Sequence, residues 1–304
     1  MFRDIVSNEE AKSFLINELK SKRQQGTYIF YGEDRDLVME FALAYAKALT
    51  CENAENDFCG VCDSCKRMDS LTHGDLEIYE DSNGIKIDRV RELAYRASTT
   101  SYEGGNRIFI LRDVEKLKKE SANALLKLIE EPEKGDFFIL TANNLNILPT
   151  IKSRSIFLKI KNRSAEELGV SSYEYDFFLG KGKEILEYKE SDADLTAGEP
   201  YSEIGIFLKN YSDEPNIINK IKIYKALRDF FKNRQYINEI EKIVFAENIS
   251  FATDSNKILL QEICSYMCHM IKDYDKLTEL IAVKNMLKMP VNTKLLMKVF
   301  INEI

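Results

Sequence analysis

The sequence predicts an α/β domain followed by an all-helical domain. Short apolar strands alternate with helical segments over residues 1–160, which is typical of βα units and of a parallel sheet covered on both faces. From residue 204 onward the strand signal is absent and apolar residues recur at helical spacing. A chain of 304 residues is also long for one hydrophobic core, so several domains are expected.

The elements of the first domain follow in order along the chain. Residues 8–24 have the pattern of an amphipathic helix that ends at a Gln-Gln-Gly break. The β-rich run 27–31 follows it and ends at Gly32, as a buried strand should. Further helices are expected at 37–49, 87–97 and 121–130, the last stopped by Pro132, and further strands at 76–79, 107–111, 137–140 and 156–160.

The remainder of the chain divides into a polar stretch and a helical stretch. Residues 162–200 are polar and charged, with a linker-like segment at 196–200. Two later sets of apolar residues each line one helix face: Ile217, Ile221, Tyr224, Leu227 and Phe231, then Leu260, Ile263, Met267 and Met270. We therefore predict three parts, at 1–160, 161–203 and 204–304, the middle one small and the last all-helical.

Composition restricts the classes of function. The chain carries 43 basic and 50 acidic side chains, for a formal charge of −7. Tight stand-alone binding of DNA normally needs a basic surface, so this balance argues against it. No apolar run approaches the ~20 residues of a membrane helix, and the amino terminus lacks the apolar stretch of a secretory signal. We expect a cytoplasmic protein with no membrane partner.

Four cysteines form a compact cluster in the sequence. Cys51, Cys59, Cys62 and Cys65 lie within fifteen residues of a chain that shows no export signal, which favours a metal over disulfides. Four thiolates close a tetrahedron, so we predict structural zinc rather than catalytic zinc, which needs an open position. The alternative is four reduced cysteines without a metal. His73 follows the cluster and is interpreted as a bystander.

A second pair of cysteines lies in the helical part. Cys264 and Cys268 are one helical turn apart, with His269 beside them. A second metal site is conceivable, but the sequence offers no further ligand nearby. We predict buried free thiols on an apolar helix face.

Gly32 stands where a strand meets a helix, which is the place of a phosphate-binding loop. Such a loop reads G-x-x-x-x-G-K-[ST], and its backbone N–H groups and lysine hold the phosphates. Here Leu37, Val38 and Met39 replace the second glycine, the lysine and the metal-binding hydroxyl. Three carboxylates in the loop would also repel a polyphosphate. Alone, this segment is an ordinary strand–turn–helix connection.

Several blocks resemble the bacterial clamp-loader subunits of DNA polymerase III, in the order that this family shows. They lie at 2–6, 85–93, 102–105, 123–132 and 148–155, and the last resembles the family pattern L-P-T-I-x-S-R-C. The resemblance implies an AAA+ type α/β domain with a zinc module at 51–65, a small lid-like region at 161–203 and a carboxy-terminal helical collar domain at 204–304.

Within this family the chain resembles the delta prime subunits more than the ATP-hydrolysing gamma/tau subunits. The hydrolytic subunits carry an acidic pair after the apolar strand to place Mg²⁺ and water, whereas this chain has Arg112 and Asp113 there. The resemblance therefore implies that this subunit binds no ATP of its own and is not an enzyme by itself. Asn143 falls at the family's sensor position, and we assign it a structural role.

The resemblance gives Arg154 a function in an assembly. In the family, the arginine of this motif reaches across a subunit interface as an arginine finger on ATP bound by the neighbour. Ser153 and Arg154 are retained here, and Ser155 replaces the usual cysteine. The implied partners are gamma/tau-type ATPase subunits, a delta subunit and, through the assembly, the sliding clamp and primed DNA.

Three other interpretations remain open from sequence. Arg154 is, on the local pattern alone, also compatible with an ordinary surface arginine that precedes a strand. The chain as a whole is compatible with an active clamp-loader ATPase that has a divergent loop, which intrinsic nucleotide binding would reveal. It is also compatible with a zinc-dependent nucleic-acid-binding module, which salt-sensitive DNA binding would reveal.

Overall fold

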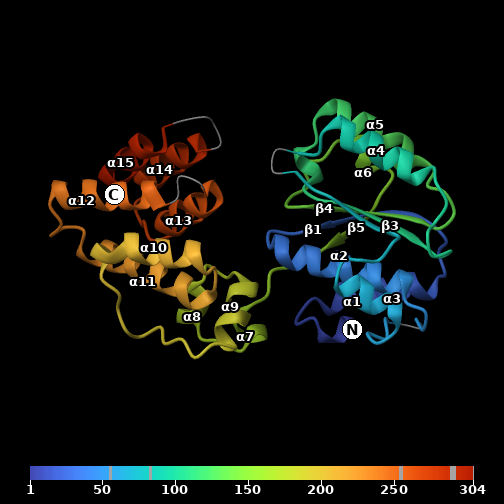
Figure 1. Ribbon diagram of the computed structural model, residues 1–304, viewed down its shortest axis with the longest axis horizontal. Helices are drawn as coiled ribbons and strands as arrows, with labels where there is room; N and C mark the ends of the chain where they lie inside the picture. The colour runs from blue at the N-terminus through green and yellow to red at the C-terminus, as the bar shows by residue number, and fades with distance from the viewer. Residues whose placement is uncertain (55–56, 82–83, 253–255, 288–291, 304) are drawn as a thin grey trace. The chain divides into compact units, whose positions relative to one another are not determined.

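The computed structural model describes residues 1–54, 57–81, 84–252, 256–287 and 292–303. The chain forms two compact units, Met1–Gly169 and Val170–Ile304. The first is α/β and the second is built from helices (Figure 1). The predicted fold class is confirmed, while the division into three parts stays a prediction.

A five-stranded parallel sheet organises the first unit. Its order is β2-β3-β4-β1-β5, so the first strand of the chain lies inside the sheet. The strands are β1 (Gly26–Tyr31), β2 (Leu76–Tyr79), β3 (Arg107–Leu111), β4 (Asp136–Ala142) and β5 (Ile156–Lys159). All pairings are parallel, with Tyr28 opposite Ile139 on one side and Ile156 on the other. The carboxyl ends of β1, β3 and β4 therefore meet at one edge of the sheet.

Helices cover both faces of this sheet (Figure 1). The helices of this unit are α1 (Glu9–Lys20), α2 (Arg35–Thr50), α3 (Asp63–Asp69), α4 (Ile87–Ala97), α5 (Lys119–Glu130), α6 (Pro149–Lys152) and α7 (Ala165–Leu168), with 3₁₀ turns at Phe2–Asp4 and Val114–Lys116. One core packs α1 and α2 against Phe30 and Ile139, and the other packs α4 and α5 against Phe109 and Leu140. The alternation of strand side chains places one apolar set on each face.

The second unit contains helices packed around aromatic side chains. They are α8 (Ser172–Phe177), α9 (Gly182–Lys189), α10 (Ile204–Asp213), α11 (Ile217–Asn233), α12 (Glu239–Ala252), α13 (Lys257–His269), α14 (Tyr274–Met286) and α15 (Thr293–Glu303), with a 3₁₀ turn at Tyr201–Glu203. The rings of Tyr224 and Tyr266 stack at 4.1 Å, and Phe177 meets both edge-on. Cys264 and Cys268 are buried thiols, as predicted. None of the described helices has the length and apolar character for a membrane crossing.

Candidate functional site

The connection between β1 and α2 is short. It consists of Gly32, Glu33 and Asp34, and the helix begins at Arg35, two residues before the predicted start. The Asp34 carboxylate accepts the Leu37 N–H at 3.0 Å and caps the helix, which is the physical reason for the earlier start. A Cβ on Gly32 would lie 2.3 Å from the Ile160 carbonyl oxygen, so only glycine fits there.

Several backbone N–H groups in this connection and in the first turn of α2 already have partners. Leu37 and Val38 are 1% and 2% exposed and belong to the core, so their side chains face away from solvent. Met39 is partly buried against the same core. The Gly32 N–H donates to the Ala142 carbonyl at 3.1 Å, and the Asp34 N–H donates to the Asn162 side-chain oxygen at 3.2 Å. The Val38 N–H donates to the Asp34 carbonyl at 2.9 Å. A phosphate would have to displace these bonds.

Basic side chains of the chain surround the predicted degenerate Mg²⁺ position at Arg112 and Asp113. Asp113 accepts hydrogen bonds from Arg35 at 3.3 Å and from Lys116 at 2.6 Å, while Arg112 pairs with Glu80 at 2.6 Å. The one carboxylate left at this position is therefore neutralised by side chains of the chain itself. Sequence analysis missed Arg35, although it is the lone cation among three acidic residues of the loop.

Asn143 completes this edge of the sheet. With its side-chain nitrogen oriented as the donor, it reaches the carbonyl oxygens of Gly32 at 3.2 Å and Glu33 at 3.1 Å. Its backbone N–H donates to Glu115 at 3.3 Å. The structure thus brings Gly32, Asp113 and Asn143 together at the carboxyl ends of three strands, and Asn143 fixes the loop in place.

Arg154 lies just after α6 and is folded back onto the same unit. Its guanidinium donates to the Thr150 carbonyl at 3.0 Å and pairs with Glu130 at 2.7 Å, and its side chain is 31% exposed. The buried Nε has no hydrogen-bond partner among the described residues. Ser153 donates to the same carbonyl at 3.0 Å. Glu130 is itself about half exposed, so this ion pair is weakly held.

The four cysteines come together in space. Their sulfur atoms all lie within 4.8 Å of one another, with 3.9 Å between Cys51 and Cys62 and 4.0 Å between Cys59 and Cys65. Zinc–sulfur bonds of about 2.3 Å in a tetrahedron place sulfurs about 3.8 Å apart. The four sulfur donors and their spacing therefore fit one metal ion in tetrahedral coordination, with all four positions filled by cysteines. His73 lies outside this group.

Backbone N–H groups prepare the sulfurs for a cation. The N–H groups of Cys59, Cys62 and Cys65 donate to the sulfurs of Cys51, Cys59 and Cys62 at 3.2, 3.3 and 3.4 Å. Donation from Val61 and Cys62 lowers the pKa of the Cys59 thiol to about 6, whereas burial raises the pKa values of Cys51 and Cys65. A cation that holds all four as thiolates would therefore release protons when it binds.

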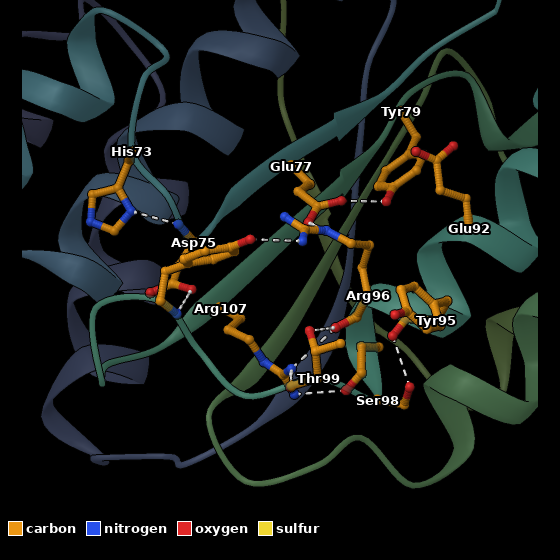
Figure 2. A network of polar contacts seen from close by, with 12 residues as sticks. His73, Asp75, Glu77, Tyr79, Glu92, Tyr95, Arg96, Ser98, Thr99 and Arg107 are labelled. Atoms are coloured by element: carbon orange, nitrogen blue, oxygen red, sulfur yellow. Dashed lines mark hydrogen bonds and ion pairs between the residues drawn. The ribbon is translucent and has the colours of Figure 1, made fainter.

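A polar network that includes His73, Asp75 and Arg96 (Figure 2) lies beside the loop 102–105 and holds it. From the sequence, this loop was noted only as part of the resemblance. The Asp75 carboxylate accepts the N–H groups of Tyr102 at 2.7 Å and Glu103 at 2.9 Å, and the Asp75 N–H donates to His73 Nδ1 at 3.2 Å. Arg96 donates to Glu77 at 2.6 Å from the end of α4. These contacts give His73 a structural partner away from the cysteines.

Comparison with known proteins places this arrangement in a family. The family model described as "DNA polymerase III, delta subunit" matches residues 7–164, more than half of the chain. The chain belongs to this family. That range contains the β1–α2 connection, the four cysteines and Arg154.

Individual relatives are similar over part of the chain. The chain is 31% identical to the delta' subunit of Bacillus subtilis over 142 residues, which are 46% of this chain and 43% of that protein. It is 30% identical to the tau subunit of Escherichia coli K12 over 169 residues, 55% of this chain and 26% of that protein. The delta' subunit of Buchnera aphidicola from Acyrthosiphon pisum is 26% identical over 225 residues, and the match covers 71% of this chain and 61% of that protein. The chain thus spans less than two thirds of each relative.

One solved structure shares the fold over nearly the whole chain. It is a DNA polymerase III gamma subunit-related protein of Thermotoga maritima, with a TM-score of 0.62 and 16% identity, and the match covers 97% of this chain and 98% of that one. At this identity the likeness concerns the fold alone.

Proposed function

We propose that this chain is a delta prime-type subunit of a bacterial DNA polymerase III clamp loader. Membership in the family and similarity to delta' and tau subunits support this assignment. Its partners would be gamma/tau-type ATPase subunits and a delta subunit, which together load the sliding clamp onto primed DNA. In this proposal, residues 161–203 act as a lid-like region and residues 204–304 as the collar that joins neighbouring subunits.

The subunit would bind no nucleotide of its own. The single observation that carries this is the β1–α2 connection with the first turn of α2, where the N–H groups of Asp34 and Leu37 are already hydrogen-bonded and the side chains of Leu37 and Val38 are buried. A working phosphate loop leaves several N–H groups and a lysine free for the phosphates. The Arg35–Asp113 pair supports the same reading, because it occupies the carboxylate that would otherwise bind Mg²⁺.

Arg154 would act on ATP held by a neighbouring subunit. Its planar donors suit phosphate oxygens, and its Nε has no hydrogen-bond partner within the part of the chain that the structure describes. To reach a neighbour it must leave Glu130, and a partly exposed pair of this kind costs little to break, on the order of 1 kcal/mol or less.

A reconstituted loader tests this role. Arg154→Ala should lower the rate of ATP hydrolysis by roughly 10³-fold or more while the complex still assembles. Arg112→Ala is the matched control, because it also removes a partly exposed, ion-paired arginine of the same unit. An unchanged rate with Arg154→Ala, or an equal loss with Arg112→Ala, would refute the finger assignment.

Cys51, Cys59, Cys62 and Cys65 would hold structural zinc. The donor set, the sulfur spacing and the N–H donors to sulfur support zinc. The ion would order residues 51–65 and contribute on the order of 10 kcal/mol to their folding. Metal analysis of protein purified without chelator should find one zinc per chain, and Cys62→Ser should lose it. Protein free of zinc would refute the site.

A further inference from the structure

The cysteine loop anchors the segment that precedes α1. Phe2 is fully buried, and its N–H donates to both carboxylate oxygens of Asp57 at 3.1 and 3.0 Å. Its ring meets Phe58 edge-on, with the ring centres 5.7 Å apart. Asp57 and Phe58 directly precede Cys59, so the anchor sits inside the loop that the four cysteines close.

The other end of this segment is fixed to the end of β5. Ser7 and Asn8 have φ values of 79° and 63°, which non-glycine residues rarely adopt without tertiary support. The Asn8 side chain donates to the Lys161 carbonyl at 2.9 Å and accepts the Lys161 N–H at 2.7 Å. Arg163, which is 3% exposed, donates to the Val6 carbonyl at 3.2 Å. Residues 2–8 therefore bridge the cysteine loop and residues 161–163.

The end of β5 in turn lies against the β1–α2 connection. Asn162 accepts the Asp34 N–H at 3.2 Å and donates to Glu33 at 3.2 Å. The Ile160 N–H donates to the Tyr31 carbonyl at 2.8 Å. A continuous line of contacts thus leads from the cysteine loop at one end of α2 to the loop at its other end.

We propose that metal binding by the four cysteines controls the order of residues 2–8 and, through them, of residues 160–163. The proposal rests on the metal site proposed above and adds a second role to it. Helix α2 has 16 residues, so the two ends of this line are roughly 24 Å apart. The metal closes the loop that holds Asp57 and Phe58, and Phe2 stays docked only while both are held in position.

Hydrogen–deuterium exchange of the full chain, read by mass spectrometry, tests this coupling. Chelation of zinc should speed exchange in the cysteine loop and also at 2–8 and 160–163, by roughly tenfold or more. Asp57→Ala should keep one zinc per chain, measured by metal analysis, yet produce the same change at 2–8 and 160–163. Asn8→Ala should speed exchange at 160–163, and chelation of zinc from this variant should produce no further increase in exchange at these residues.

Asp194→Ala is the matched control, since Asp194 also accepts backbone N–H groups but lies in the second unit. It should leave exchange at 2–8 and 160–163 unchanged. If chelation speeds exchange only within residues 51–69, or equally in β3 and β4, the coupling is refuted while the metal site stands. Protein without bound zinc would overturn the metal site together with the coupling.

Discussion

Arg107 makes the ion pair whose removal should be most costly to the first unit. Its guanidinium holds Asp136 through two bonds of 2.6 and 2.9 Å, and the two residues are 8% and 1% exposed. It also donates to the carbonyl of Ala97 at 2.9 Å, at the end of α4, and to the carbonyl of Thr99, which follows the helix (Figure 2). Arg107→Met keeps the apolar stem and removes every one of these bonds.

The expected loss follows from the carboxylate that is left behind. An unpaired charge in the interior costs about 3–5 kcal/mol of unfolding free energy at about pH 7. Burial already raises the pKa of Asp136 above its ordinary value, and Arg107 opposes that rise, so the variant should raise the pKa further. A carboxyl with a raised folded pKa destabilises the folded state while it is ionised, so the loss should shrink as the pH falls through that raised pKa and the carboxyl gains its proton.

The chain has two compact units and no tryptophan, so the measurement must report the first unit by itself. Hydrogen exchange of the β3 and β4 amides does so, and it gives the unfolding free energy of that unit. Asp136→Asn and the double variant complete a double-mutant cycle, in which the double variant should recover about 2 kcal/mol relative to additivity. A loss below about 1 kcal/mol for Arg107→Met, or a loss independent of pH, would refute this reasoning.

Two further predictions concern other parts of the chain. Gly32→Ala should destabilise the first unit by about 1–3 kcal/mol, because the new Cβ would lie 2.3 Å from the Ile160 carbonyl oxygen. Hydrogen exchange of the β1 amides is the measurement. Gly198→Ala is the control, because a Cβ at that position would meet no atom within 4 Å. In the second unit, Lys181 and Lys220 hold the pKa of Glu262 below its usual 4.5 against the opposing effect of burial. The stability that Glu262 contributes should therefore be present above about pH 4.5 and be lost as the pH falls below it. Hydrogen exchange of the α13 amides measures this pH dependence, and the Glu262→Gln variant should lack it.

The strands and the core of the first unit were predictable from sequence for a physical reason. Strands buried on both faces read as apolar runs, and the predicted runs match β1 to β5 within three residues at each end. Helix ends were less predictable, because capping decides them. The helix predicted to extend to residue 24 ends at Lys20, and the chain then turns at Lys22, whose φ is 50°.

The candidate site was predictable only where its residues are neighbours in sequence. The four cysteines follow a ligand spacing, so their proximity could be predicted. The partners that close the β1–α2 connection could not, because Arg35–Asp113 joins residues 78 apart and Asp34–Asn162 joins residues 128 apart. No local pattern carries information about such pairs, and the same holds for Phe2 and Asp57.

Equilibrium binding of Mg-ATP to the purified chain tests the central claim most directly. A gamma/tau subunit with an intact phosphate loop serves as the positive control, and the titration extends to millimolar nucleotide. The hydrogen-bonded N–H groups of Gly32, Asp34, Leu37 and Val38, together with the Arg35–Asp113 pair, predict no saturable binding. Saturable binding in the micromolar range would contradict the account, and an active clamp-loader ATPase with a divergent loop would become the favoured interpretation.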